Sequence, residues 1–452
     1  MAKRFRACNL DQAYLLPPSL HDWLPERHLA RFLAELTSEL DLGKFYSKYE
    51  EGDGRGLAAY DPEMMVRLLL YAYCVGKRSS RQIEKATYED LAFRYLSADQ
   101  HPDHDTIANF RKSHLESLAE LFGQVLRLCR NAGMVKLGPV AIDGTKVQAN
   151  ASPSHTVKYK QLEETEREIE RRVKQILDEA AAADDKDDER YGRGRSDEDL
   201  PDELATSQAR LKKIREAKEK LEQEAHEKAA QAEAERRDNG GKHASQASKK
   251  RFHRATADIR TTNPQHNFTD PDSKLMKDAA TGGYLQAYNA QIAVAEGSQI
   301  IVAAEVSREP GDRSLLPLMA GAVKSELNGN PEVLLADAGY FSVEAIECLK
   351  QNGCDCLISP ERFRGRHREA VQSHNTAKHR WAVYMREQLR SEAGRKLYQA
   401  RRCLVEPVFG QIKAARNIRA FLLRSIQSVR AEWRLVCLTH NLLKLFRQRC
   451  PG

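Results

Sequence analysis

The sequence lacks any long apolar run. Residues 1–16 mix basic, polar and apolar side chains, so they do not predict a secretory signal peptide. No stretch approaches the roughly 20 apolar residues that a membrane-spanning helix needs. The nine cysteines are odd in number and have no regular spacing, which disfavours a disulfide framework and indicates reduced thiols. We therefore expect a cytoplasmic protein that does not associate with membranes.

Metal sites built on cysteine and histidine are lacking as well. Cys354 and Cys356 are too close together for a zinc-binding pair, and no second pair follows them. His101 and His104 have no cluster of cysteines or carboxylates at zinc spacing beside them, so they predict a solvated turn before a helix. A zinc-based function is therefore disfavoured.

Acidic residues are scarce in one long segment. The whole chain has 72 Lys and Arg against 65 Asp and Glu, a net charge of +7. Residues 361–430 contain 17 Lys and Arg against 5 Glu and no Asp, a net charge of +12, so the rest of the chain sums to −5. A basic segment of this density predicts an acidic polymer as partner, above all nucleic acid. The alternative, a solvated surface with no partner, leaves the scarcity of acidic residues unexplained.

The length of 452 residues predicts two or three domains. Residues 1–135 are expected to form a helical N-terminal domain. Apolar residues recur there at helical spacing, first from Leu29 to Leu36 and again from Met64 to Tyr71.

A helix-turn-helix is one interpretation of the later part of this domain. Residues 80–85 predict a short helix, and Asp105 or Thr106 is placed to cap a later helix that ends near Cys129. Such a motif would bind DNA. A plain helical bundle satisfies the same pattern.

Residues 157–250 form a highly charged, helix-forming segment. Two apolar stripes predict two helices packed as a hairpin or short coiled coil, inserted into another domain. Residues 184–202 between them are rich in charge, Gly and Ser, and predict a flexible link. The alternative is a mobile insertion without a partner. The stripes consist of Leu162, Ile169, Val173 and Ile176, and of Leu204, Leu211, Ile214 and Leu221.

Strand signals flank this insertion, in residues 136–156 and in residues 251–452. Helices are expected at residues 315–327 and 343–351, and the C-terminal part is mainly helical. Together these segments predict an α/β domain with a mixed sheet flanked by helices. The predicted strands are Pro139–Asp143, Tyr288–Val294, Ile300–Val306, Glu332–Ala336 and Cys356–Ser359.

Two of the predicted strands end on an aspartate, at Asp143 and Asp337. Carboxylates at the ends of adjacent strands point into one crevice, where a divalent cation relieves their repulsion. Oxygen ligands without a histidine or cysteine cluster favour Mg²⁺, with Mn²⁺ as a substitute. With a third carboxylate they predict a site for two ions that cleaves phosphodiesters.

Glu406 is the candidate third carboxylate, because it is an isolated acid in the most basic segment. Arg402 lies four residues before it and Lys413 seven after, so basic groups are expected near one face of a helix. The alternative is a structural ion pair with Arg402, which does not explain the two strand-end aspartates. Asp312, by contrast, is expected to be the N-cap of the helix that follows it.

Three motifs resemble those of prokaryotic insertion-sequence transposases of the DDE type. They are Ala-Ile-Asp143-Gly-Thr, Leu-Ala-Asp337-Ala-Gly-Tyr-Phe and Val-Glu406-Pro-Val-Phe-Gly-Gln-Ile-Lys413. The stretches at residues 269–277, 283–291 and 433–444 and the helical N-terminal region are also similar to these transposases. The resemblance covers nearly all of the chain except the charged insertion, and its motifs occur in the expected order.

The resemblance implies a ribonuclease-H-like catalytic domain that cleaves DNA at the element's ends and joins the freed 3′-hydroxyl to target DNA. Asp143, Asp337 and Glu406 would be the catalytic carboxylates and the ligands of two Mg²⁺ ions. Many relatives carry the signature Y-x2-R-x3-E-x6-K, which Arg402, Glu406 and Lys413 fit. The tyrosine position is Gln399, whereas Tyr398 is one residue off. DNA contacts are expected from Arg402, Lys413, Arg416 and Arg419.

The N-terminal domain would then bind the element's ends, and at least a dimer is expected on double-stranded DNA because two ends must be brought together. We expect the protein to be nucleoid-associated while acting. Two alternatives remain open: a transposase-derived DNA-binding protein without catalysis, and a ribonuclease-H-like nuclease without strand transfer. A coiled-coil scaffold would explain only residues 157–237.

Overall fold

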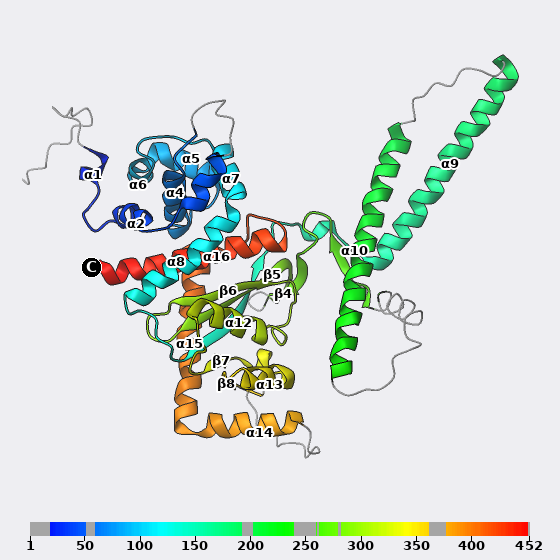
Figure 1. Ribbon diagram of the computed structural model, residues 1–452. Helices are drawn as coiled ribbons and strands as arrows, with labels where there is room; N and C mark the ends of the chain where they lie inside the picture. The colour runs from blue at the N-terminus through cyan, green and yellow to red at the C-terminus, as the bar shows by residue number, and fades with distance from the viewer. Residues whose placement is uncertain are drawn as a thin grey trace, which may run out of the picture. The chain divides into compact units, whose positions relative to one another are not determined.

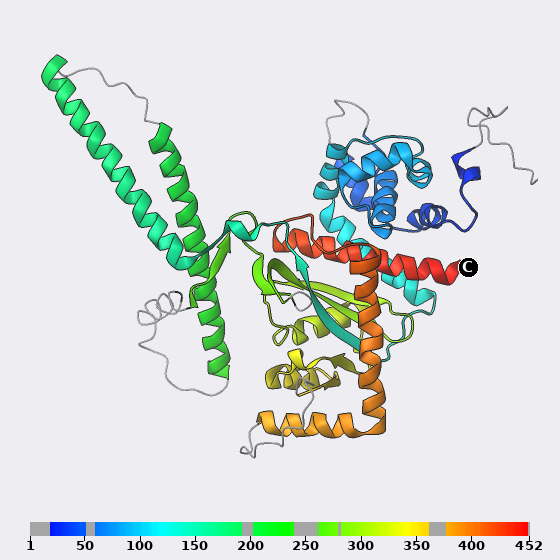
Figure 2. The same ribbon diagram turned by 180° about the vertical axis from the view of Figure 1, so that it is seen from behind.

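The computed structural model falls into two compact units, shown from two sides in Figures 1 and 2. Unit 1 combines residues 1–148 with residues 288–452, and unit 2 comprises residues 149–287. No helix in the described part of the chain is long and apolar enough to cross a membrane. The structure describes residues 19–50, 59–191, 202–238, 259, 262–278, 282–360 and 377–450.

The N-terminal part of unit 1 is helical. Helix α4 shows why these residues form helices: Pro62 occupies its first turn, and the Asp61 side chain accepts hydrogen bonds from two backbone amides. Most of the side chains in α4 are buried, so it lies at the centre of this region. The helices are α1 (Leu20–Trp23), α2 (Leu29–Ser38), α3 (Gly43–Glu50), α4 (Pro62–Cys74), α5 (Ser80–Glu89), α6 (Leu91–Leu96), α7 (His104–Ser113) and α8 (Leu115–Asn131).

The single later helix predicted for this region is in fact two helices. Helix α7 ends at Ser113, His114 breaks the run, and α8 follows directly. The cap of α7 is Asp103, whose carboxylate accepts from the Thr106 amide at 2.7 Å, so the prediction of Asp105 or Thr106 as cap was wrong. The His-Pro-Asp-His stretch offers several residues suited to capping, and periodicity alone does not choose among them.

The second part of unit 1 is built on a mixed sheet. Its strands lie in the order β6-β5-β1-β7-β8. Strand β1 is parallel to β7, β7 is parallel to β8, and β5 is antiparallel to β6. The prediction of a mixed sheet is therefore confirmed. The strands are β1 (Val140–Gln148), β5 (Tyr284–Ala295), β6 (Ile301–Ser307), β7 (Leu334–Ala336) and β8 (Cys356–Ile358).

Strand β1 is longer than predicted. It continues through Asp143 to Gln148 instead of ending at the aspartate. The apolar run does end there, but β5 lies beside β1, and the last residue of β1 is bonded to the chain after α15: the Gln148 amide donates to the Arg419 carbonyl at 3.1 Å. Neighbouring strands can therefore keep polar residues extended, which an apolar pattern does not reveal. Strand β7 does end just before Asp337, as expected.

Helices flank the sheet of unit 1. Helix α15 packs on β1 and β7, whereas α12 and α16 pack on β6. Helix α16 also packs on α4 and α8, so it links the N-terminal helices to the sheet. These elements are α12 (Leu316–Leu327), the short turn η2 (Ala338–Tyr340), α13 (Val343–Gln351), α14 (Ala377–Arg390), α15 (Glu392–Gly410), the π-turn η3 (Gln411–Ala415) and α16 (Ile426–Arg449).

A buried ion pair joins the turn after α4 to α16. The Arg78 guanidinium lies 3.0 Å from the Glu432 carboxylate, whose side chain is 0% exposed. The same carboxylate accepts from the Leu422 and Leu423 amides at 3.0 Å, and Arg78 also donates to the Ala420 carbonyl at 2.9 Å. Every charge in this group therefore has close partners, as buried charges require.

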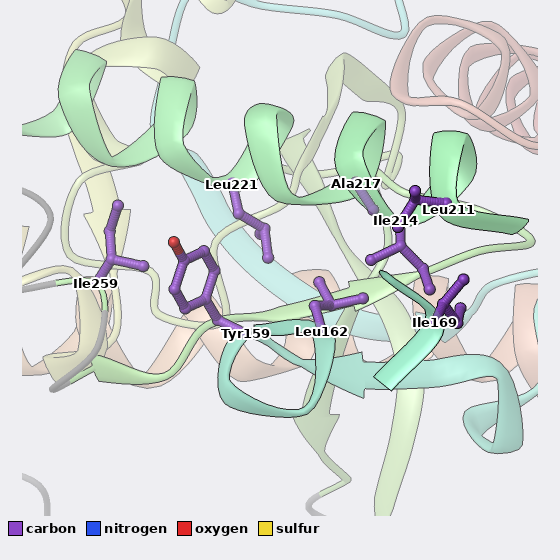
Figure 3. Close-up of a cluster of buried hydrophobic side chains, with 8 residues drawn as sticks. All are labelled: Tyr159, Leu162, Ile169, Leu211, Ile214, Ala217, Leu221 and Ile259. Carbon is purple, nitrogen blue, oxygen red and sulfur yellow. The ribbon is translucent and has the colours of Figure 1, made fainter. Parts of the chain in front are cut away.

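Unit 2 contains two long helices that pack against each other. One apolar cluster holds them together, as Figure 3 shows. The predicted apolar stripes contribute to this cluster from both helices. Its members are Tyr159, Leu162, Ile169, Leu211, Ile214, Ala217, Leu221 and Ile259. The elements of unit 2 are η1 (Pro153–His155), β2 (Thr156–Lys158), α9 (Tyr159–Tyr191), α10 (Asp202–Asp238), β3 (Gln265–Asn267) and β4 (Lys274–Lys277).

The rest of unit 2 is a small β structure and a set of ion pairs. Strands β2 and β3 form an antiparallel pair, and β4 pairs with the first residues of β5. On the outside of the helix pair, Arg215 contacts Glu166 at 3.1 Å and Glu170 at 2.7 Å. Helix α9 continues to Tyr191, so it takes up the first part of the predicted link, and residues 192–201 lie outside the described part of the chain.

Candidate active site

Asp143 and Asp337 lie beside each other in the sheet. Strands β1 and β7 are parallel, with Ala141 opposite Leu335. Asp143 lies two residues after Ala141 in β1, and Asp337 lies two residues after Leu335, directly after β7. The Asp143 carboxylate accepts from the Gly144 amide at 2.8 Å. The Asp337 carboxylate accepts from the Gly339 amide, also at 2.8 Å, which fixes the turn after β7. The parallel register therefore brings together the two predicted aspartates.

The electrostatic environment of Asp143 disfavours its charged form. Burial raises its pKa to about 6, and the carboxylates of Asp337 and Asp312 add to the rise, whereas Arg401 and the Gly144 amide oppose it. Loss of water and repulsion between acids both favour the protonated carboxyl. A carboxyl in this condition gains from any cation that reaches it.

Arg401 is the basic residue nearest to Asp143. Its guanidinium Nη1 lies 3.4 Å from Asp143 Oδ2, and its side chain is 9% exposed. It lies over the Tyr398 ring, with 5.6 Å from the guanidinium carbon to the ring centroid. Burial raises the pKa of Tyr398, which is also within electrostatic range of Asp337. Arg401 therefore contacts Asp143 directly, and Tyr398 belongs to the same surroundings.

Asp312 is a third carboxylate of this region, and it is not the helix cap that the sequence predicted. Helix α12 begins at Leu316, and its N-cap is Leu315, with no capping side chain. Asp312 Oδ1 instead accepts from the side-chain amides of Asn289, at 2.7 Å, and Gln291, at 3.1 Å. The prediction failed because the chain makes one more turn before the helix starts.

Lys146 and Tyr340 complete the polar group around Asp312. Lys146 Nζ lies 3.7 Å from Asp312 Oδ1. Burial lowers the pKa of Lys146, and Asp312, Asp143 and Asp337 counteract that shift. The Tyr340 hydroxyl donates to Gln291, and burial together with the same three aspartates raises its pKa.

Gly144 is favoured by the closeness of the neighbouring strand. A Cβ atom at this position would lie 2.1 Å from Gln291 Nε2 and 3.1 Å from Asn289 Oδ1. The first contact would force the hydrogen-bonded Gln291 side chain to move and the second is tight, so the position favours glycine. The Asp-Gly pair of the sequence thus reflects packing of β1 on two amides that also bind Asp312.

Glu406 and Arg402 lie on an exposed side of α15, which they share because they are one helical turn apart. The buried side of the helix contains Arg401, Leu404, Val405 and Val408. In the described part of the chain, no group of three or more His, Cys, Asp or Glu residues is placed to hold a metal ion. The structure therefore brings Asp143 and Asp337 together and leaves Glu406 apart from them.

Lys413 and Arg419 follow on the π-turn and the loop after it. Lys413 Nζ donates to Thr145 Oγ1 at 2.6 Å and to the Lys146 carbonyl at 2.7 Å, so it lies beside β1. Arg419 is exposed, and its Nε donates to the Lys413 carbonyl at 3.3 Å. These two residues are placed near the strand that carries Asp143.

Arg416 has a different position from the other predicted DNA contacts. It is 4% exposed, and its guanidinium donates to Thr439 Oγ1 at 2.8 Å and to the Val436 carbonyl at 3.2 Å. Burial lowers its pKa to about 10. The Arg416 carbonyl is also close to Gly76, where a Cβ would lie 2.5 Å away. In this fold Arg416 is a structural residue without access to DNA.

The donors around Asp143 fit a hard divalent cation. They are carboxylate oxygens, which Mg²⁺ and Mn²⁺ prefer. Burial, and to a smaller extent Asp337 and Asp312, raise the pKa of Asp143, so a cation that stabilises its charged form is favoured. Lys146 and Arg401 supply part of the missing positive charge. The two aspartates therefore suit a metal ion, and a third ligand has to come from elsewhere.

Sequence reasoning missed Arg401, Lys146 and Asp312. The signal for Arg401 was present, because it forms one helical face with Leu404 and Val408, and that face is buried. The signals for Lys146 and Asp312 were weak, because their role depends on buried amides of a strand distant in sequence.

Two family models match the chain. One, described as a transposase domain (DUF772), matches residues 18–113, and the other, a transposase DDE domain, matches residues 258–442. Together they cover more than half of the sequence. The second match includes Asp337, Arg401 and Glu406 but begins after Asp143. The comparisons with curated proteins and with solved structures gave no match.

Proposed function

The chain belongs to the DDE-type insertion-sequence transposases, and we propose that it binds the terminal inverted repeats of an insertion sequence and catalyses metal-dependent DNA strand cleavage and strand transfer. The observation that carries the proposal is the pair Asp143 and Asp337 on adjacent parallel strands, where burial and mutual repulsion hold the pKa of Asp143 at about 6. Structural ion pairs also perturb pKa values, and Arg401 forms such a contact with Asp143, but burial, Asp337 and Asp312 outweigh it, which suits a cation site.

The fold supports the same proposal. The parallel strands β1, β7 and β8 lie on one side of the sheet, the antiparallel strands β5 and β6 continue it beyond β1, and helices flank it. We propose that this is a ribonuclease-H-like domain. Its catalytic site would then lie at Asp143 and Asp337, on the neighbouring strand β1 and directly after β7.

In the proposed mechanism, Asp143 and Asp337 hold Mg²⁺, for which Mn²⁺ can substitute. The chemistry that two bound ions supply is activation of a water or hydroxyl nucleophile and stabilisation of the leaving oxygen of a phosphodiester. Glu406 is the proposed third carboxylate. Because it lies on the exposed side of α15, it reaches the aspartates only if its side chain or the helix shifts when DNA binds.

Basic side chains orient the DNA in this proposal. Lys413 lies beside β1, where it donates to Thr145, and we propose that its ammonium contacts a backbone phosphate. Arg402 and Arg419 are exposed, and in this proposal they contact phosphates of the same DNA strand. Arg401 stays against Asp143 and orients its carboxylate.

The partners of the protein follow from the reaction. Both the element's ends and the target are double-stranded DNA, and the N-terminal helical region is the proposed end-binding part. Two ends must be held together, so we propose a homodimer or higher assembly on DNA. We also propose a cytoplasmic protein that is nucleoid-associated while it acts.

A cleavage and strand-transfer assay tests this function. Purified protein is incubated with Mg²⁺ and labelled DNA that carries the element's ends. We expect nicking and joining by the wild type, and loss of both, on the order of 10³-fold or more, in Asp143→Asn, Asp337→Asn and Glu406→Gln. All three variants should still bind the DNA. The matched control is Glu392→Gln, an exposed glutamate of the same helix that pairs with Lys396, and it should retain full activity.

Each other outcome contradicts a particular part of the proposal. Degradation without joining would indicate a nuclease. DNA binding without metal-dependent chemistry would indicate a DNA-binding protein that has lost catalysis. Full activity of Glu406→Gln would remove Glu406 from the carboxylate set.

A further inference from the structure

We propose that Asp312 is a positioning residue of this active site: it holds the Lys146 ammonium and so keeps Asp143 and Asp337 open to a divalent cation. The inference rests on the proposed function, because it assumes that a cation binds at those two aspartates.

Asp312 is held firmly on its own. Its Oδ1 accepts from Asn289 at 2.7 Å and from Gln291 at 3.1 Å. Both amides are 0% exposed and come from β5, so the carboxylate is anchored to the sheet. Gln291 also accepts from the Tyr340 hydroxyl, which ties Asp312 to the turn that follows Asp337. Such a network fixes a side chain more tightly than a single hydrogen bond does.

The other oxygen of Asp312 faces the same turn. A Cβ atom at Gly339 would lie 3.5 Å from Asp312 Oδ2 and 2.9 Å from Asp337 Oδ1. Both carboxylates therefore lie close to the same glycine. Asp312 is near the site, yet it belongs to no group of three acids placed to hold a metal among the described residues.

Lys146 is the residue through which Asp312 acts. Its ammonium is 3.7 Å from Asp312 and is also attracted by Asp143 and Asp337, and its side chain is 18% exposed. A lysine has a long flexible stem and a compact charge, so it can turn from one carboxylate to another. Without Asp312, its remaining acidic partners are the two proposed metal ligands. A bound ammonium there would compete with a divalent cation.

The role is distinct from that of Arg401. The guanidinium of Arg401 contacts Asp143 from α15, which packs on β1 and β7, whereas Asn289 and Gln291 belong to β5. Arg401 therefore stays in contact with Asp143, whereas Lys146 is attracted to Asp312. The cation must displace only the first of these contacts.

A double-mutant cycle tests the inference. Mn²⁺ binding to the full-length protein without DNA is measured by titration calorimetry for wild type, Asp312→Asn, Lys146→Met and the double variant. We expect Asp312→Asn to weaken Mn²⁺ binding about 10-fold or more, as loss of a supporting residue commonly does. The double variant should bind within about 3-fold of Lys146→Met, because no ammonium remains to compete.

The outcomes separate the inference from its alternatives. If the double variant binds Mn²⁺ as weakly as Asp312→Asn, Asp312 acts directly on the metal and the inference is wrong. Unchanged binding in Asp312→Asn also overturns it. If Asp312→Asn does not fold, the double variant decides: Mn²⁺ binding within about 3-fold of Lys146→Met supports the inference, and binding about 10-fold or more weaker contradicts it.

Asp143→Asn in the same titration distinguishes a failure of the proposed function. Wild-type binding that Asp143→Asn abolishes supports the metal site, whatever Asp312 does. Binding that Asp143→Asn leaves intact, or no binding by the wild type, removes the site and with it the inference.

Discussion

Unit 1 contains a buried carboxylate, Glu432, and a half-buried one, Asp143, whose surroundings differ. Burial raises the pKa of both Glu432 and Asp143. Glu432 has an arginine at 3.0 Å and two backbone amides from the loop before α16. Asp143 has one amide from its own neighbour and an arginine at the longer distance of 3.4 Å. Its other close neighbours are acids.

The difference separates a structural charge from a functional one. The partners of Glu432 come from two segments of the chain, the turn after α4 and the loop before α16, so the carboxylate ties the N-terminal helices to the rest of unit 1. Asp143 is left short of positive charge, because nothing in the fold supplies enough of it. Sites that bind cations keep this deficit, at a cost in stability.

The largest expected effect concerns Glu432. We expect Glu432→Ala to lower the free energy of unfolding by about 3–5 kcal/mol, because it leaves the buried Arg78 guanidinium without its partner. Urea denaturation measures the change. Glu432→Met combined with Arg78→Met should recover much of the loss, since no charge then stays buried. A loss below about 1 kcal/mol in Glu432→Ala would show that Glu432 is no better satisfied than Asp143.

The same kind of change at Asp143 should have the opposite effect on stability. We expect Asp143→Asn to leave the free energy of unfolding unchanged or raise it at pH 7, because repulsion from the neighbouring acids is relieved. Urea denaturation at pH 7 without metal checks this. Destabilisation as large as that of Glu432→Ala would mean that Asp143 is a structural charge after all.

The pH dependence of stability sharpens the comparison further. The folded pKa of Asp143, about 6, lies above the ordinary aspartate value of 3.8, so the unfolded chain loses this proton first as pH rises. The free energy of unfolding should therefore fall between about pH 4 and pH 6, by up to about 3 kcal/mol, and stay level above. Denaturation curves at several pH values measure it. The fall should be smaller in Asp143→Asn, and a curve identical to wild type would contradict the assignment.

The smallest effect is expected at an exposed ion pair. Arg215 on α10 contacts Glu166 and Glu170, but its side chain is 56% exposed. We expect Arg215→Gln to shift the thermal midpoint of the full chain by less than about 2 °C, because water screens such pairs. Differential scanning fluorimetry is sufficient for this measurement. A larger shift would show that exposure alone does not rank these charges.

Much of the fold could be predicted from the sequence. The strands that became β5, β6, β7 and β8 were identified because their apolar runs are short and bounded by turn residues. The prediction for β1 stopped at Asp143, since the polar residues after it are kept extended by other parts of the chain. The helix break at His114 was missed because no Gly or Pro marks it.

The candidate site was predictable only in part. Asp143 and Asp337 were found because each follows an apolar strand, and parallel pairing does the rest. Arg402 was preferred over Arg401 on motif spacing, whereas the buried face of α15 selects Arg401 for contact with Asp143. Asp312 was assigned to a helix cap because its partners, two amides of β5, are invisible to local pattern.

The place where the chain leaves unit 1 has a consequence for how this protein can vary. Unit 2 begins after the last residue of β1 and ends within β5, and these two strands are neighbours in the sheet. Unit 2 is therefore inserted into the connection between β1 and β5, which a short turn could also make. Chain entropy depends only weakly on the length of such a connection, each doubling costing roughly 0.6 kcal/mol. Related sequences can therefore shorten, lengthen or exchange this inserted unit, while the strand register of the sheet in unit 1 and the positions of Asp143 and Asp337 stay the same.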